Sequence, residues 1–243
     1  MSDDDPFALA DDAEAGSDPH KLRNGHVCRT EKRGHALPRG RSIFEIVVDA
    51  SEGVVPLWAA GVTLRYRFDR RSLARFRDPV AAKAGLRRLF GDALLAWGDA
   101  VPVRFSERAS GTDFEILVRN ADDCDTAGCT LARAFFPDAG RHQLVIYPKM
   151  LTQPRVEQIE TLVHELGHVF GLRHFFAQLS ETAWPSHLFG THNRFSIMNY
   201  GADSKLTEAD RADLKALYAQ VWSGALKTIN GTPIKLFKPF SAA

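Results

Sequence analysis

Two histidines and a glutamate stand close together in the second half of the 243-residue chain, in the run His164-Glu165-Leu166-Gly167-His168. On a helix, residues four apart lie on one face with about 6 Å of rise between them, so His164 and His168 can grip one metal ion. Glu165 points to the side of that pair, where a carboxylate can accept a proton from a metal-activated water without being a ligand. The spacing therefore predicts a metal site suited to hydrolysis.

A glycine and a third histidine follow at regular spacing. Gly171 comes three residues after His168, and His174 comes three residues after Gly171. A glycine in a left-handed conformation turns the backbone back, so that His174 reaches the same ion as the helical pair. Three neutral imidazoles with one open position suit Zn²⁺, because a catalytic zinc site is tetrahedral and keeps one place for water. We therefore expect one catalytic zinc ion on His164, His168 and His174.

Helices must position these residues. The apolar stripe over 157–170 predicts an amphipathic helix that carries the first two histidines and ends at Gly171 as its C-cap. Apolar residues at helical spacing predict an earlier helix over 80–97, with Asp78 as its N-cap. A last helix is predicted over 207–221.

Six short segments rich in β-branched or aromatic residues predict strands. The clearest is 62–68, in which apolar and polar residues alternate with period two. The six segments are 43–48, 62–68, 101–105, 114–118, 131–136 and 143–147. Their order, with one helix among them, is typical of an α/β or α+β sheet with one crossover.

The extended motif from His164 to His174 resembles the zinc signature of the metzincin clan of metallopeptidases. Downstream, the run Ser196-Ile-Met-Asn-Tyr200 resembles the Met-turn of that clan, whose methionine, here Met198, forms an apolar floor under the three imidazoles. The resemblance implies a zincin-like α/β (α+β) fold. Its parts would be a twisted, mostly parallel five-stranded sheet with an antiparallel edge strand, a backing helix, the zinc helix and a C-terminal helix.

Tyr200 lies two residues after Met198 and resembles a tyrosine of the astacin and serralysin groups. In those groups it serves as a fifth zinc ligand and swings out to stabilise the oxyanion. A phenol suits this role, because it donates a hydrogen bond to the charge that develops on the scissile carbonyl oxygen. The alternative is a buried structural tyrosine. Phe175 stands where astacins carry a glutamate, so the resemblance to that group is partial.

Two other stretches resemble matrixins. Residues 128–137 resemble the edge strand above the active-site cleft, and residues 206–218 resemble the C-terminal helix. An exposed edge strand binds an extended peptide as one more strand. The candidate substrate contacts are Leu131, Ala132, Arg133 and Ala134. Matrixins place a histidine ligand of a structural zinc where Arg133 stands, and no acidic calcium loop is evident, so neither a second zinc nor structural calcium is predicted.

Composition and charge limit the classes of function and the domain organisation that the chain can have. Lys and Arg total 31 against 30 for Asp and Glu. The overall charge therefore gives no reason to expect that the protein binds nucleic acid or an anionic membrane. No run approaches the roughly 18 apolar residues of a membrane span. Residues 1–20 hold seven acids and no Lys or Arg, whereas 21–41 hold seven basic residues and one acid. We therefore predict a charged, flexible N-terminal arm over 1–42, which could serve as a pro-segment, and one catalytic domain over 43–243.

The three cysteines are too few for a disulfide scaffold, but Cys124 and Cys129 can close one small loop in an oxidising compartment. Two interpretations of Cys28 stay open. It is either a free surface thiol or a latency ligand whose thiolate holds the zinc, as in matrixin propeptides. The resemblance suggests secretion, whereas the first residues lack the pattern of a signal peptide, so the sequence leaves the compartment undetermined.

Together these observations predict a monomeric, zinc-dependent endopeptidase that acts on extended peptide or protein substrates. Glu165 would be the general base and Tyr200 the donor to the transition state. The alternative is a catalytically silent, zinc-containing module that binds an extended peptide without cutting it. Glu165 favours the enzyme, because a module that only binds has no need of a base there.

Overall fold

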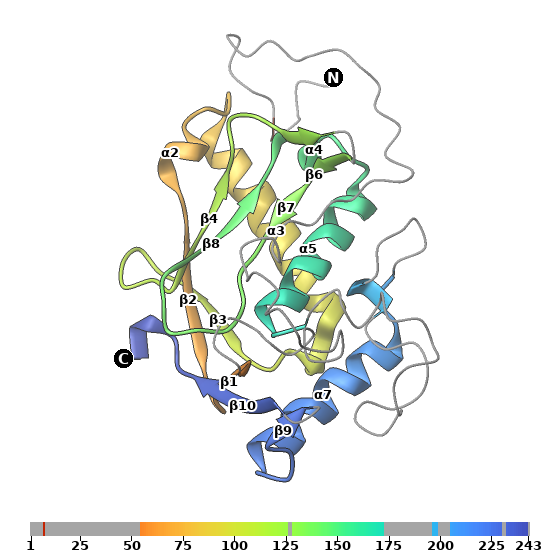
Figure 1. Cartoon of the computed structure of the whole chain (residues 1–243). Coiled ribbons are helices and arrows are strands. Elements are labelled where there is room, and N and C mark those ends of the chain that lie inside the picture. The colour runs from red at the N-terminus through yellow and green to blue at the C-terminus, as the bar shows by residue number, and fades with distance from the viewer. Residues whose placement is uncertain are drawn as a thin grey trace.

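The structure is a computed structural model that describes residue 7 and residues 54–125, 128–172, 196–198, 205–229 and 232–242. Two long helices lie beside a twisted sheet, and a third helix and a small second sheet lie at one end of it (Figure 1). Within the described ranges, no helix is both long and apolar enough to cross a membrane.

Four parallel strands and one antiparallel strand form the main sheet, in the order β3-β2-β4-β8-β7. The strands are β2 (Thr63–Phe68), β3 (Arg104–Glu107), β4 (Phe114–Val118), β7 (Ala132–Arg133) and β8 (His142–Ile146). Every second residue of β2 is buried and Arg65 and Arg67 between them are exposed, because successive side chains point to opposite faces. The predicted mostly parallel sheet with an antiparallel edge strand is confirmed.

The two long helices pack against one another beside this sheet (Figure 1). Helix α3 (Pro79–Trp97) connects β2 to β3, and α5 (Arg155–Val169) follows β8. The Phe90 ring of α3 lies 5.1 Å from the Tyr66 ring of β2, measured between centroids. Through this aromatic contact the sheet supports α3, and α3 in turn supports α5.

Helix α7 (Glu208–Trp222) closes one end of the core. It begins with a capping box, in which the Thr207 hydroxyl accepts from the Asp210 amide and the Asp210 carboxylate accepts from the Thr207 amide at 2.6 Å. Its buried face includes Leu214 and Tyr218. The shorter helical segments are α2 (Arg70–Leu73), α4 (Pro148–Leu151), η2 (Gly98–Ala100), η3 (Ser196–Met198) and η4 (Phe240–Ala242).

A second sheet, which the sequence analysis did not predict, lies next to α7 (Figure 1). Strand β1 (Val55–Trp58) pairs in parallel with β10 (Thr232–Phe237), which pairs antiparallel with β9 (Thr228–Ile229). We call β1, β10 and β9 the C-terminal sheet. The sequence signal was weak because Pro56 and Pro233 interrupt its two longer strands, and proline argues against strand structure.

The three predicted helices and three of the six predicted strands are confirmed to within two residues at each end. The confirmed segments are 62–68, 80–97, 114–118, 143–147, 157–170 and 207–221. The strand predicted at 101–105 differs, because it joins the sheet only at Arg104. Pro102 has no N–H to donate, so the chain around it cannot take part in the ladder.

The strand predicted at 131–136 is much shorter than expected. Only Ala132–Arg133 pairs with β8. After this pair the chain leaves the sheet, and the Phe135 ring stacks on the His142 ring with centroids 4.3 Å apart. The apolar pattern beyond Arg133 therefore reflects burial of aromatic residues and not a longer strand.

The division between arm and domain stays a prediction. The predicted strand at 43–48 and the arm over 1–42 lie outside the described residues, apart from Phe7. The Phe7 ring lies edge-on to the ring of the buried Phe76, with centroids 6.3 Å apart.

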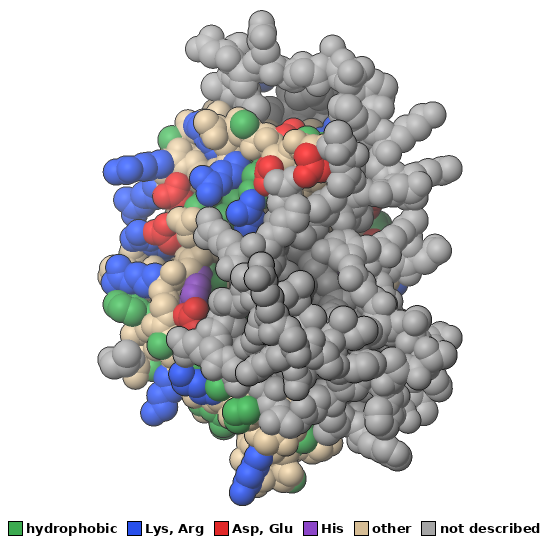
Figure 2. All heavy atoms as spheres, viewed as in Figure 1, with side chains coloured by type: hydrophobic (Ala, Val, Ile, Leu, Met, Phe, Trp, Pro, Cys, Tyr) green, Lys and Arg blue, Asp and Glu red, His purple; other side chains and the backbone are tan. Residues whose placement is uncertain are grey.

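On the face seen in Figure 2, Lys and Arg side chains gather near α2, with Asp and Glu side chains between them. The Arg67 Nε donates to Glu115 at 2.7 Å, and the Arg87 Nε donates to Glu107 at 2.8 Å. Exposed pairs of this kind stabilise a fold by at most about 1 kcal/mol. On the face of Figure 2 basic and acidic side chains lie next to one another, so this face is mixed in sign.

Asp78→Ala removes the carboxylate that accepts the amide hydrogens of Val80 and Ala81, both at 2.9 Å. We expect the free energy of unfolding to fall by about 1 kcal/mol, the usual cost of losing an N-cap, in a denaturant titration followed by circular dichroism. Asp92→Ala on the same helix is the control, because it removes only an exposed pair with Arg155 and should cost less than about 0.5 kcal/mol. Equal losses would contradict the capping role.

Candidate metal centre

Helix α5 brings His164 and His168 together on one face. Their ring centroids are 5.0 Å apart and the ring planes are nearly perpendicular, at 86°. His168 is fully buried and His164 is partly buried. The described residues thus include two of the three predicted ligands, and the predicted third, His174, lies outside them.

A backbone carbonyl fixes the orientation of each ring. The Nδ1 of His164 lies 2.7 Å from the Ile197 carbonyl oxygen, and the Nδ1 of His168 lies 2.8 Å from the Leu172 carbonyl oxygen. A carbonyl only accepts, so each Nδ1 carries the hydrogen and the lone pair of the neutral ring is on Nε2. This is the tautomer that a metal-ligating imidazole needs, so both residues fit a zinc ion.

The turn after α5 supplies one of these acceptors. Gly171 has φ of 90°, and its N–H donates to the His168 carbonyl at 2.8 Å while the Leu172 N–H donates to the Gly167 carbonyl at 2.9 Å. These two bonds form a Schellman motif, which directs the Leu172 carbonyl back onto the His168 ring. The turn therefore orients the ring of His168, a candidate ligand inside the helix, in addition to redirecting the chain.

Gly171 has no room for a side chain, in addition to its left-handed backbone conformation. A Cβ added there would lie 2.7 Å from Leu57 Cδ2 and 2.9 Å from the Pro56 carbonyl oxygen. Both of these atoms belong to β1. Gly171 was predicted to be needed for its left-handed conformation, and the structure adds a close approach to the C-terminal sheet.

Met198 packs directly beneath α5. It is fully buried in η3, and a Cβ added to Gly167 would overlap its Sδ atom. Ile197, the residue before it, is the one whose carbonyl orients His164. The role of Gly167 was not predicted from the sequence, although a glycine in the interior of an otherwise good helix is a signal of close packing.

Glu165 lies beside His164 in α5 and is only 2% exposed. Carboxylates are seldom buried to this degree, because desolvation penalises the charge. The described residues place this carboxylate in the helix that carries the two imidazoles, next to the first of them in sequence.

Side chains from elsewhere in the chain anchor the backbone of α5 at its carbonyl groups. The Trp97 Nε1 donates to the Val163 carbonyl at 3.0 Å, and the Trp58 Nε1 donates to the Val169 carbonyl at 2.7 Å. The last four carbonyls of a helix have no partner within it, so the Trp58 bond satisfies one of them. Neither tryptophan was predicted from the sequence to support this helix.

Tyr218 of α7 caps the same helix end. Its hydroxyl donates to the Phe170 carbonyl at 2.9 Å and accepts from the Trp58 N–H at 3.3 Å. Complete burial raises the pKa of Tyr218 well above its usual value, so the hydroxyl keeps its proton and stays a donor.

The predicted substrate strand lies close to this helix. Leu131 and Ala132 are buried, and β7 forms the end of the main sheet. Three residues after β7, the Phe136 ring lies edge-on to the His168 ring, with centroids 5.3 Å apart. The edge of the sheet and the candidate ligands are therefore neighbours. Ala134 follows in the same segment and is half-buried.

Arg133, which stands where a structural metal ligand was considered, makes polar contacts with its neighbours. Its guanidinium donates to the Tyr147 hydroxyl at 2.6 Å and to the Asp123 carboxylate at 3.2 Å. These contacts tie the edge strand to the segment after β8 and to the hairpin before β7.

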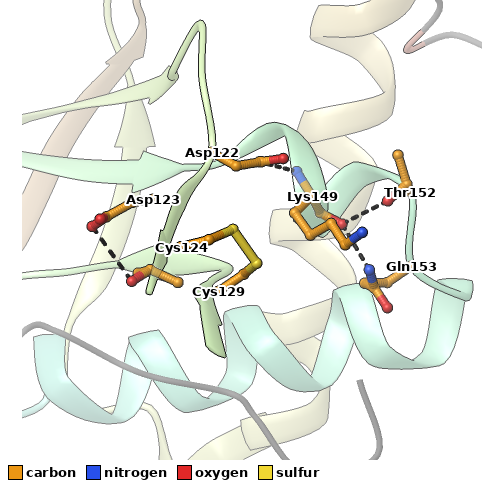
Figure 3. Close-up of a disulfide and its surroundings, with 8 residues drawn as sticks. Asp122, Asp123, Cys124, Cys129, Lys149, Thr152 and Gln153 are labelled. Carbon is orange, nitrogen blue, oxygen red and sulfur yellow. Dashed lines mark hydrogen bonds between the residues drawn. A yellow bond between two sulfur atoms is a disulfide. The ribbon is translucent and has the colours of Figure 1, made fainter. Parts of the chain in front are cut away.

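A disulfide closes that hairpin (Figure 3). Strands β5 (Asp123–Asp125) and β6 (Gly128–Thr130) pair with Cys124 opposite Cys129, and the structure joins the two cysteines with their Cα atoms 4.0 Å apart. Just before β5, the Asp122 carboxylate accepts from the Lys149 amide at 2.7 Å, which fixes the hairpin to α4. The chain thus enters the edge strand from a cross-linked hairpin.

Tyr200 and Cys28 lie outside the described residues, so their predicted roles are carried forward as predictions. Among the described residues there is no cluster of three or more His, Cys, Asp or Glu side chains placed to hold a metal.

A zincin-like sheet with an antiparallel edge strand, an adjacent helix with paired histidines and a methionine beneath it define the metzincin clan of metallopeptidases. A sequence model of the matrixin family matches residues 58–219, about two thirds of the chain. The chain therefore belongs to the matrixin family.

Individual relatives are more distant. The chain is 35% identical over 106 residues to the macrophage metalloelastase of Rattus norvegicus, covering 40% of this chain and 23% of the relative. It is 30% identical over 135 residues to the metalloendoproteinase 4-MMP of Arabidopsis thaliana, covering 49% of this chain and 38% of the relative. The chain thus matches well under half the length of these relatives.

Among solved structures, that of myroilysin aligns with a TM-score of 0.41 and 13% identity, covering 67% of this chain and 95% of that chain.

Gly167→Ala tests the packing of Met198 against α5. The added methyl group would overlap the sulfur, so we expect the free energy of unfolding to fall by about 1–3 kcal/mol. Gly91→Ala on α3 is the matched control, because no atom lies within 4 Å of the added Cβ. It should be neutral or stabilising by up to about 1 kcal/mol, since alanine is the better helix former. A Gly167 variant as stable as the Gly91 variant would refute the contact.

Replacing Cys124 and Cys129 together by serine tests the cross-linked hairpin. The two cysteines are 5 residues apart, and closing so small a loop is worth about 2 kcal/mol in the chain-entropy model. We expect that loss in the free energy of unfolding, measured in denaturant without reductant. Cys28→Ser, outside the hairpin, should leave it unchanged. If the double variant is as stable as the parent, the bond does not contribute to the fold.

Proposed function

We propose that this protein is a zinc-dependent endopeptidase, with one Zn²⁺ held by His164, His168 and His174. The observation that carries the proposal is the pair of hydrogen bonds from the two Nδ1 atoms to the carbonyls of Ile197 and Leu172. Both bonds leave Nε2 as the nitrogen that can bind a metal. A hydrogen bond from the other ring nitrogen to a carbonyl also raises the basicity of a ligating imidazole. Membership of the matrixin family supports the same metal.

The chemistry divides between the metal and the protein. When bound, Zn²⁺ polarises the scissile carbonyl and lowers the pKa of a water molecule to about 7. Glu165 acts as general base, because its carboxylate accepts a proton as water attacks the carbonyl carbon. It then acts as general acid and delivers that proton to the nitrogen of the departing amine. Its burial in α5 keeps the carboxylate away from bulk water.

Tyr200 and Met198 have supporting roles in this proposal. The Tyr200 phenol donates a hydrogen bond to the oxygen on which negative charge develops, and it can serve as a fifth zinc ligand before substrate binds. Met198 forms the apolar floor, in keeping with its complete burial beneath Gly167.

The substrate is an extended peptide that adds to the sheet beside β7. Main-chain hydrogen bonds to residues 131–134 would align it, and this mode of binding needs no particular side chain in the peptide. The edge-on contact between Phe136 and His168 supports the proposal, because it brings the segment after β7 next to a metal ligand.

Glu165→Gln separates catalysis from metal binding. We expect the variant to keep one zinc per chain by elemental analysis and to lose about a hundredfold to ten-thousandfold in kcat/KM on a denatured protein substrate. Glu160→Gln on the same helix is the matched control and should retain the activity. Zinc in the parent chain with no cleavage by it would instead support a silent peptide-binding module, and a chain without zinc would contradict both functions.

A further inference from the structure

We infer that the C-terminal sheet is a positioning element for the metal centre, which holds the turn that orients His168. The inference rests on the proposed zinc site and adds residues that lie outside the family match. That match covers 58–219, whereas β9, β10 and all of β1 except Trp58 lie beyond it. Figure 1 shows β10, near the end of the chain, lying along β1 at the foot of the main sheet.

Strand β10 is the only sheet partner of β1 among the described residues. The two strands pair over their full shared length, from Val55 opposite Ile234 to Trp58 opposite Phe237. The Ala59 N–H extends the ladder by donating to the Phe237 carbonyl at 2.9 Å. A four-residue strand without this ladder would have no sheet to hold it.

Strand β1 in turn contacts the end of α5. Leu57 and the Pro56 carbonyl lie so close to Gly171 that a single Cβ there would strike both. The Trp58 indole donates to the Val169 carbonyl at 2.7 Å. Leu57 and Trp58 are almost completely buried, at 1% and 0% exposure. A shift of β1 would therefore move the turn that it touches.

The position of this turn determines the orientation of the His168 ring. The Leu172 carbonyl, directly after Gly171, accepts from the Nδ1 of His168 at 2.8 Å. Loss of such an outer contact typically weakens metal binding by about tenfold to a hundredfold. The path from β10 to His168 thus consists of one strand ladder, one packed turn and one hydrogen bond.

The far end of the C-terminal segment is fastened to the main sheet. The Ser241 N–H and hydroxyl donate to the Asp113 carboxylate at 2.7 and 3.1 Å. Asp113 is buried and also accepts from the Arg65 amide in β2 at 2.7 Å. The C-terminal segment is consequently held at two places, by the pairing of β10 with β1 and by the bonds from Ser241 to this carboxylate.

Truncation after Leu226 tests the inference, because it removes β9 and β10 but leaves α7 and its capping turn. Two properties would be measured. The first is the zinc dissociation constant by chelator competition, which we expect to rise at least about tenfold. The second is the ring N–H resonance of each histidine by NMR in zinc-free protein, where we expect the His168 signal to be lost and the His164 signal to persist.

Lys238→Ala is the matched control. Lys238 lies in the same C-terminal segment and is exposed, so the loss of its side chain should leave both measurements unchanged. If circular dichroism shows that the truncated chain does not fold, the test uses Ser241→Ala in the full chain, which removes one donor to Asp113. The same two measurements are made, and we expect a smaller rise in the zinc dissociation constant and a weaker His168 signal.

The outcomes separate this inference from the proposed function. A full chain that binds no zinc would contradict the proposed function, and the ring signals would still test the support of His168. A full chain that binds zinc, with a folded truncated chain of equal affinity and both ring signals intact, would overturn the inference alone.

Discussion

The structure of the site depends on one constraint, which is that a metal-ligating imidazole must present one nitrogen and keep a hydrogen on the other. Two backbone carbonyls meet this constraint for His164 and His168. Because the acceptors are main-chain atoms of Ile197 and Leu172, their positions follow from the path of the chain. The turn after α5 and the short helix η3 therefore belong to the candidate site as much as the two histidines do.

Holding the Leu172 carbonyl in place requires a rigid end to α5. A helix leaves its last carbonyls without internal partners, and here buried donors satisfy two of them. The Trp58 indole donates to the Val169 carbonyl, and the Tyr218 hydroxyl donates to the Phe170 carbonyl. The Trp58 backbone amide in turn donates to the Tyr218 hydroxyl. Aromatic side chains suit this task, because each combines one polar group with a large apolar surface that packs in the core.

The edge strand next to the site is held by polar contacts of Arg133 and by a covalent bond in the preceding hairpin. Arg133 donates to Asp123 and Tyr147, and the Cys124–Cys129 bond closes the hairpin that leads into the strand. The two polar contacts of Arg133 and the disulfide together fix the position of the edge strand and of the hairpin before it. In the proposed function, an extended substrate would meet an edge strand whose backbone is already ordered, so binding would cost less conformational entropy.

The sequence by itself determined the local features: the helix over 157–170, the histidine spacing on it, and the conformation of Gly171. Each depends on residues within a turn or two of one another, where periodicity and backbone sterics decide. Only the tertiary structure decided which carbonyl orients His164, because Ile197 lies 33 residues away. It also decided the contact between Gly167 and Met198 and the presence of the C-terminal sheet, since packing between distant segments leaves no period in the sequence and outweighs the local preference of proline against strands.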